Sequence, residues 1–132
     1  MTPIILTLPL RLESVANLRE HWAKRAKRAK QHRGVVSMAL RVQLPPSGPQ
    51  SPIMGLQWPL EVVLTRIAPR ALDSHDNLRS ACKASADGIA DALGIKDNDP
   101  RVTWRYGQEK PAKGTAKGQK YGLRVELRAM GG

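Results

Sequence analysis

Every aspartate of this chain lies within residues 72–101, whose sequence is LDSHDNLRSACKASADGIADALGIKDNDPR, and the glutamates all lie elsewhere. Carboxylate oxygens are the ligands that Mg²⁺ prefers in proteins. The ion is usually held by a few carboxylates, while waters and phosphate oxygens complete its coordination shell. This aspartate-rich stretch is therefore the candidate site for metal-dependent chemistry. The aspartates are Asp73, Asp76, Asp87, Asp91, Asp97 and Asp99.

The rest of the chain is strongly basic, with a formal net charge of +11 and a pI near 10.6. Lys and Arg side chains that neutralise phosphates release condensed counterions, which supplies most non-specific affinity for nucleic acids. A carboxylate-held ion beside such a surface is suited to cutting phosphodiesters, because it polarises a phosphoryl oxygen, activates water and neutralises the leaving oxygen. We therefore expect a nucleic-acid partner and nuclease chemistry.

Length and composition indicate one domain over residues 1–132, since 41% of the residues are hydrophobic. The single cysteine, Cys82, cannot form an intramolecular disulfide, which favours a reducing compartment. The apolar run at the N-terminus is too short for a signal peptide or a membrane span. No basic amphipathic helix with large apolar anchors is evident either. We therefore expect a cytoplasmic protein without a membrane partner.

Hydrophobic patterning predicts an α/β (α+β) fold: a small mixed four-stranded sheet with two main helices, in the order β-α-β-α-β-β. The last two strands alternate apolar and polar residues and are predicted to form a hairpin. A proline-rich connection covers residues 44–59, and a basic hairpin loop covers residues 110–120. The predicted strands are residues 4–10, 60–70, 101–110 and 120–130, and the predicted helices are residues 15–42 and 76–93.

The first predicted helix is rich in Lys and Arg. Its expected buried residues are Leu18, Trp22, Val36 and Leu40. We expect Ser14 to cap its N-terminus and Gly34 to divide it. A run of charge on a helix is often only a solvated face, but the charge of the whole chain favours phosphate contacts here. The predicted DNA-binding residues are Lys24, Arg25, Lys27 and Arg28 in this helix, and Lys113 and Lys117 in the basic loop.

The second predicted helix has an apolar stripe and ends at Gly94. On the opposite side, Asp76, Lys83 and Asp87 project within a narrow sector. If the helix N-terminus lies beside the loop that follows the helix, Asp73, Asp76 and Asp97 or Asp99 converge on a divalent cation. Lys83 then places a positive charge near the phosphate that reacts. The stripe consists of Leu78, Cys82, Ser85, Ile89 and Leu93.

A purely structural role accounts for the same aspartates. Asp73 and Asp76 are also suited to capping the helix N-terminus. Residues 97–100 have the composition of an Asx-type turn. Asp87 and Asp91 are equally suited to solvated helix positions paired with Lys83 or Arg79.

The motif LDSHDNL, followed by Lys83, Asp87 and LGIKDNDPRV, resembles the RusA family of phage and prophage Holliday junction resolvases. The similarity covers most of residues 60–128. It implies a small α/β homodimer in a bacterial host cell, which binds four-way DNA junctions and makes paired cuts that depend on Mg²⁺, with Mn²⁺ as a possible substitute. Carried over by motif position, the catalytic residues are Asp73, Asp76, Lys83, and Asp97 or Asp99, and the aspartates are the metal ligands. Asn77, Leu78 and Asp87 match supporting positions.

The spacing departs from the family pattern at two places. The first two aspartates are three residues apart rather than two, and the Lys follows Asp76 by seven residues rather than four, where Ser80 stands. Lys83 remains on the same helical face but about one turn further on, roughly 5 Å.

The alternative is a non-catalytic nucleic-acid-binding protein with the same fold. Apolar residues available for a dimer contact, or equally for covering the core, are Ile53, Met54, Leu56 and Trp58.

Overall fold

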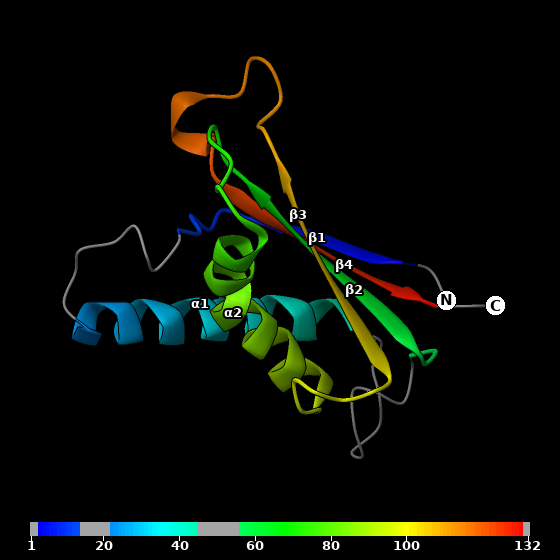
Figure 1. Ribbon diagram of the computed structural model, residues 1–132. Coiled ribbons are helices and arrows are strands. Elements are labelled where there is room, and N and C mark those ends of the chain that lie inside the picture. The colour runs from blue at the N-terminus through cyan, green and yellow to red at the C-terminus, as the bar shows by residue number, and fades with distance from the viewer. Residues whose placement is uncertain (1–2, 14–21, 45–55, 131–132) are drawn as a thin grey trace.

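Figure 1 shows the computed structural model, which describes residues 3–13, 22–44 and 56–130. The order of elements confirms the predicted fold class, with four strands in one sheet and two main helices. The elements are β1 (Ile4–Leu8), α1 (Trp22–Gln43), β2 (Leu60–Ile67), α2 (His75–Leu93), β3 (Val102–Glu109), the short 3-10 helix η3 (Lys117–Gln119) and β4 (Gly122–Ala129).

The sheet has the strand order β1-β4-β2-β3, so β2 lies in the interior and β3 at an edge. Strands β2 and β3 are parallel, whereas β4 runs antiparallel to both β2 and β1. A parallel pair requires a long crossover connection, and α2 supplies it. The β2-α2-β3 unit therefore places the aspartate-rich stretch beside the edge strand.

The predicted hairpin of the last two strands is wrong, because β2 lies between β3 and β4 and pairs with both. Their connection passes the end of β2, where the Ala68 amide donates to the Glu109 carbonyl. Crossing two strand spacings requires roughly 10 Å. The connecting segment has ample length for that step, whereas hairpin loops are usually two to five residues long.

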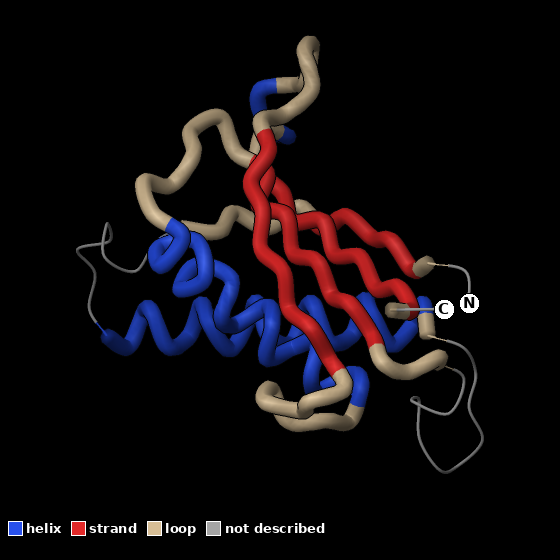
Figure 2. The backbone as a smooth tube through the Cα atoms, turned by 45° about the vertical axis from the view of Figure 1, so that its right-hand side comes forward, coloured by secondary structure: helices blue, strands red, loops and turns tan. Residues whose placement is uncertain are grey.

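Both helices cover the same face of the sheet (Figure 2). Alternate strand residues point into this layer, and β2 contributes Leu60, Val62 and Leu64 to the core. Helix α2 buries the predicted stripe from Leu78 to Leu93. Gly94 ends this helix in the left-handed conformation, as predicted, with φ 71°. The N-terminal cap is neither of the aspartates considered but Ser74, whose hydroxyl accepts from the Asn77 amide.

Helix α1 agrees with its sequence pattern only in its second half. Val36 and Leu40 are buried as predicted, but Trp22 is 68% exposed, which contradicts its assignment to the core. Gly34 lies inside one continuous helix and does not divide it. Leu18 and Ser14 lie outside the described residues. In the described ranges, neither helix has the length and apolar character needed to cross a membrane.

The proline-rich connection is described only from Leu56 onward. Leu56 belongs to the hydrophobic core, so the core-covering role considered for it is the one observed. Trp58 packs against the same core, and the Arg101 guanidinium lies 4.4 Å from the centre of its indole ring. Ile53 and Met54 fall outside the described residues.

The opposite face of the sheet carries a ladder of alternating charges across β2, β3 and β4. Glu61 accepts from Arg105 at 2.8 Å and pairs with Arg128 at 3.1 Å. Arg128 also contacts Glu126, which in turn contacts Arg124. Arg124 then makes two hydrogen bonds, of 2.8 and 3.0 Å, to Glu109. Each carboxylate on this face therefore has a guanidinium partner.

Helices α1 and α2 approach each other closely at Gly88. A methyl group at this position would overlap the backbone carbonyl of Arg33 in α1. Beside this contact, the Arg33 guanidinium binds both carboxylate oxygens of Asp91, at 2.6 and 2.8 Å. Arg41 donates to the Asp91 carbonyl oxygen at 3.2 Å. Asp91 therefore joins the two helices rather than pairing with Lys83 or Arg79.

We expect Gly88→Ala to lower the free energy of unfolding by about 1–3 kcal/mol, because the added methyl group meets rigid backbone. Gly34→Ala is the matched control, since nothing lies within 4 Å of the added carbon. In an open helical position, alanine should instead raise stability by about 0.5–1 kcal/mol. Urea unfolding followed by circular dichroism measures both effects. Equal effects of the two substitutions would contradict the close approach of the helices.

Candidate functional site

Two of the predicted metal ligands line one hollow between α2 and the edge strand β3. Asp76 lies in the first turn of α2, and Asp97 lies in the turn that follows this helix. Both carboxylates line a cavity of about 750 Å³ together with Lys83 from the middle of α2. This grouping has two causes. Asp76 and Lys83 share one face of α2, and the chain turns back after Gly94 so that Asp97 lies beside them.

Lys83 links the hollow to the neighbouring turn of α2. Its ammonium group donates to Asp87 at 2.9 Å and to Asp97 at 3.0 Å. These hydrogen bonds raise the pKa of Lys83, that to Asp87 being the larger contribution. The hydrogen bond from Lys83 is also the main cause that lowers the pKa of Asp97. At neutral pH the hollow therefore contains an ammonium group held between two carboxylates.

The other two predicted ligands, Asp73 and Asp99, lie elsewhere. Asp73 precedes the cap residue and lines a different hollow, with Arg70 and Tyr121. Asp99 binds the guanidinium of Arg101 through both oxygens, at 3.0 and 2.8 Å. It also accepts from the Arg101 amide at 2.9 Å, and this partner lowers the pKa of Asp99 to about 2. Asp99 thus stabilises the turn over residues 97–100, which is the purely structural role considered for it above.

The remaining donor set can accept Mg²⁺ only with help from the substrate. In the part of the chain that the structure describes, no three His, Cys, Asp or Glu side chains are grouped so as to hold a metal ion. Asp76 and Asp97 supply carboxylate oxygens from one hollow. Mg²⁺ is commonly bound by one or two carboxylates plus waters and substrate phosphates. Both residues carry ligand groups of that type, and both line one hollow.

The loop that leads to α2 is held by two side chains that the sequence analysis did not single out. The buried Arg66 donates to the carbonyl oxygens of Leu12 and Arg70, both at 2.8 Å. The Gln108 amide accepts from the Leu72 amide at 2.7 Å and donates to the Leu72 carbonyl at 3.3 Å. Both side chains lie at the ends of strands. They fix the backbone immediately before Asp73 and the start of α2.

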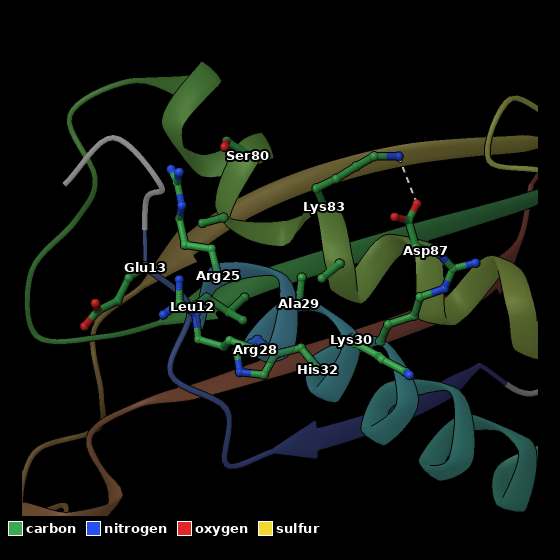
Figure 3. Close-up of a pocket in the computed structure, with 13 residues that line it drawn as sticks. Leu12, Glu13, Arg25, Arg28, Ala29, Lys30, His32, Ser80, Lys83 and Asp87 are labelled. Atoms are coloured by element: carbon green, nitrogen blue, oxygen red, sulfur yellow. Dashed lines mark hydrogen bonds and ion pairs between the residues drawn. The ribbon is translucent and has the colours of Figure 1, made fainter. Parts of the chain in front are cut away.

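A second groove, of about 450 Å³, lies between α1 and α2 (Figure 3). Arg25 and Arg28 line it from α1, and Ser80 and Lys83 line it from α2. Ser80 and Lys83 also line the hollow that contains Asp76. The two concave regions therefore meet at these residues. Basic side chains of α1 therefore line a groove that adjoins the hollow of Asp76 and Asp97.

The other predicted DNA-binding residues lie outside this groove. Lys24 and Lys27 are exposed on α1. Lys113 and Lys117 are exposed on the connection between β3 and β4, which projects beyond the sheet as the orange segment in Figure 1. Of the six predicted DNA-binding residues, only Arg25 and Arg28 line the groove that meets the candidate site.

The far wall of the hollow is aromatic, and the sequence analysis described these residues only as parts of a strand. Trp104 and Tyr106 both line the cavity from β3. The His75 ring stands nearly perpendicular to the Tyr106 ring, with centroids 6.3 Å apart. The Arg79 guanidinium lies 6.0 Å from the same ring centre. The signal available in the sequence was their alternate spacing within the strand, which places both rings on one face of it.

Comparison with known proteins gives a relative but no family. No protein-family profile matches the chain. The chain is similar to an uncharacterized protein of Xylella fastidiosa (strain Temecula1), with 38% identity over 94 residues. The alignment covers 70% of this chain and 59% of that protein. The chain therefore matches less than two thirds of the length of this relative.

We expect Lys83→Met to raise the pKa of Asp97, because the substitution removes the ammonium group that stabilises its charged form. NMR titration of the side-chain carboxyl carbons measures this change. The pKa of Asp99 is an internal control and should stay at about 2, since its partner is Arg101. An unchanged titration of Asp97 would show that Lys83 does not bind it in solution.

Proposed function

We propose that the protein is a Mg²⁺-dependent endodeoxyribonuclease of the RusA type, which resolves four-way DNA junctions by paired phosphodiester cleavage. The observation that carries this proposal is the grouping of Asp76, Lys83 and Asp97 in one hollow that meets a basic groove. Carboxylates for a metal ion and cations for a DNA backbone thus adjoin each other. This combination is suited to metal-dependent phosphodiester hydrolysis.

In this proposal Asp76 and Asp97 hold Mg²⁺, for which Mn²⁺ can substitute. When bound, the ion polarises the scissile phosphate and activates the attacking water. Lys83 neutralises Asp97 before the substrate arrives, since its ammonium lies 3.0 Å from that carboxylate. With DNA present, the same ammonium is available to a phosphate oxygen at the reacting centre. Asp87 keeps one hydrogen bond to Lys83 and so positions it.

Arg25 and Arg28 bind the phosphate backbone on the approach to this centre. They reach the groove from α1, while Lys83 closes it from α2 (Figure 3). A DNA strand laid along the groove therefore passes from two guanidinium groups to the carboxylate hollow. The contacts involve the backbone, so they fix the position of the strand without reading sequence.

A four-way junction offers equivalent phosphodiesters on opposite strands, and one chain supplies one carboxylate hollow. We therefore propose a homodimer with two-fold symmetry, which presents two such hollows to the junction. Junction resolution would take place in the cytoplasm of a bacterial host cell.

We expect Asp76→Asn to abolish Mg²⁺-dependent cleavage of a synthetic four-way junction while preserving binding, because the variant loses a metal-ligating charge but no basic residue. Asp99→Asn is the matched control and should retain cleavage, since Asp99 is paired with Arg101. Cleavage is followed by gel electrophoresis, with linear duplex as the second substrate. Mixing Asp76→Asn with wild-type chains should yield heterodimers that nick one strand only. Wild-type rates for Asp76→Asn at saturating Mg²⁺ would exclude the metal site.

A non-catalytic nucleic-acid-binding protein is the second candidate. The observation that favours it is the pairing of Lys83 with both Asp87 and Asp97, which neutralises one of the two carboxylates offered to a metal ion. The junction assay separates the two functions directly. Tight binding by the wild-type protein without Mg²⁺-dependent nicking would favour this second candidate.

We expect replacement of Arg25 and Arg28 by Ala to weaken binding to all DNA and to flatten its dependence on salt. The slope of log K against log salt should fall by roughly 0.9 for each phosphate that the variant no longer neutralises. Replacement of Lys24 and Lys27 by Ala removes the same charge from the same helix outside the groove, and should change the slope less. Fluorescence anisotropy with labelled duplex over a range of salt concentrations measures both variants. Equal slopes for the two variants would place the DNA elsewhere.

A further inference from the structure

We infer that the aromatic wall of the hollow is a stacking site for one unpaired nucleobase of the DNA strand whose phosphate lies at Lys83. The inference rests on the proposed nucleic-acid substrate and extends it, because it assigns a role to Trp104 and Tyr106 and a ligand class to the hollow. The ligand is a nucleotide with its base out of the duplex stack.

The first observation is the location of the aromatic rings. The chain has only three Trp and two Tyr and no Phe, yet two of these rings line the hollow that holds the carboxylates. Both lie on the helix-covered face of β3, paired with Val62 and Leu64 of β2. The pairing of β3 with β2 therefore fixes the backbone of both residues. Their placement beside exposed charged side chains provides a flat apolar surface at the candidate active site.

The second observation is the set of groups around Tyr106. The His75 ring lies at 77° to it in a T-shaped arrangement, with centroids 6.3 Å apart. The Arg79 guanidinium lies 6.0 Å from the ring centre, which is within range of a cation–π contact. Aromatic rings and planar guanidinium groups are the surfaces on which unpaired bases stack. Three such groups lie together here: His75 and Arg79 of α2, and Tyr106 of β3.

The third observation is size. The hollow has a volume of about 750 Å³, within the range of pockets that enclose small organic ligands and ample for one nucleotide. Its opposite wall carries Asp76, Lys83 and Asp97, which are suited to a phosphate and its cation. A base on the aromatic wall and its phosphate on the charged wall match the two chemical halves of a nucleotide.

This arrangement gives a physical reason for selectivity toward branched DNA. In the open form of a four-way junction, base pairs at the branch point lack stacking neighbours on one side, so a base there leaves the stack at lower cost than within a linear duplex. A protein that binds an unstacked base therefore gains affinity at the branch. No recognition of base sequence is required, since every base has a stacking face.

The test measures binding without cleavage, in EDTA, with a fluorescein-labelled short oligothymidylate and the full-length protein. We expect Tyr106→Ala to weaken binding about tenfold, within the range for the loss of one base–aromatic stack. The salt slope should stay unchanged, because every phosphate-binding cation is retained. Tyr106→Phe should bind like wild type, since it keeps the ring. Tyr121→Ala is the matched control, because this tyrosine lies outside the hollow against Arg11.

An abasic strand of equal length separates the base from the phosphate. Wild-type protein should bind it about tenfold more weakly than oligothymidylate, and Tyr106→Ala should weaken it no further. Tyr106→Leu keeps apolar volume at this half-buried position and repeats the test if the alanine variant unfolds. Equal affinity of Tyr106→Ala and wild type for oligothymidylate would overturn the inference. An absence of junction cleavage by wild-type protein would reject the nuclease proposal but leave the stacking result standing.

Discussion

The structure depends on one close approach, where the backbone of α1 at Arg33 meets Gly88 of α2. No side chain fits between them, so the helices lie nearer than ordinary side-chain packing allows. The two hydrogen bonds from Arg33 to Asp91 hold α2 at that distance. Because both helices cover one face of the sheet, their contact also sets the width of the groove between Arg25 and Lys83. The arrangement of the candidate site follows from this packing.

The sequence was sufficient to predict features that depend only on the repeat of a single helix or strand. The buried stripe of α2, its end at Gly94 and the alternation within β2 were predicted because local geometry alone produces them. The pairing of β3 and β4 was not predictable in this way. Two alternating segments joined by a long loop are compatible with a hairpin, but also with a crossing over a third strand. The parallel pairing of β3 with β2 resolves that choice, and it depends on distant residues.

The same distinction applies to the candidate site. Asp76 and Lys83 were predicted to share a face because both belong to one helix, and they line one hollow. The choice between Asp97 and Asp99 depended on the backbone of a turn, which spacing does not specify. There Arg101 binds Asp99, and Lys83 reaches Asp97. Trp104 and Tyr106 were overlooked because alternation in a strand indicates burial without revealing what the buried face adjoins.

The charge ladder on the open sheet face has an effect at long range. Its three Glu and three Arg cancel, so this side of the protein contributes almost nothing to the net charge of +11. The surplus cations lie elsewhere, many of them on α1, and the molecule is therefore an electric dipole as well as a cation. In the field of a polyanion such a body experiences a torque before contact. With a nucleic acid as the partner, as proposed, encounters would begin with α1 turned toward the phosphates, which would shorten the rotational search that limits association rates.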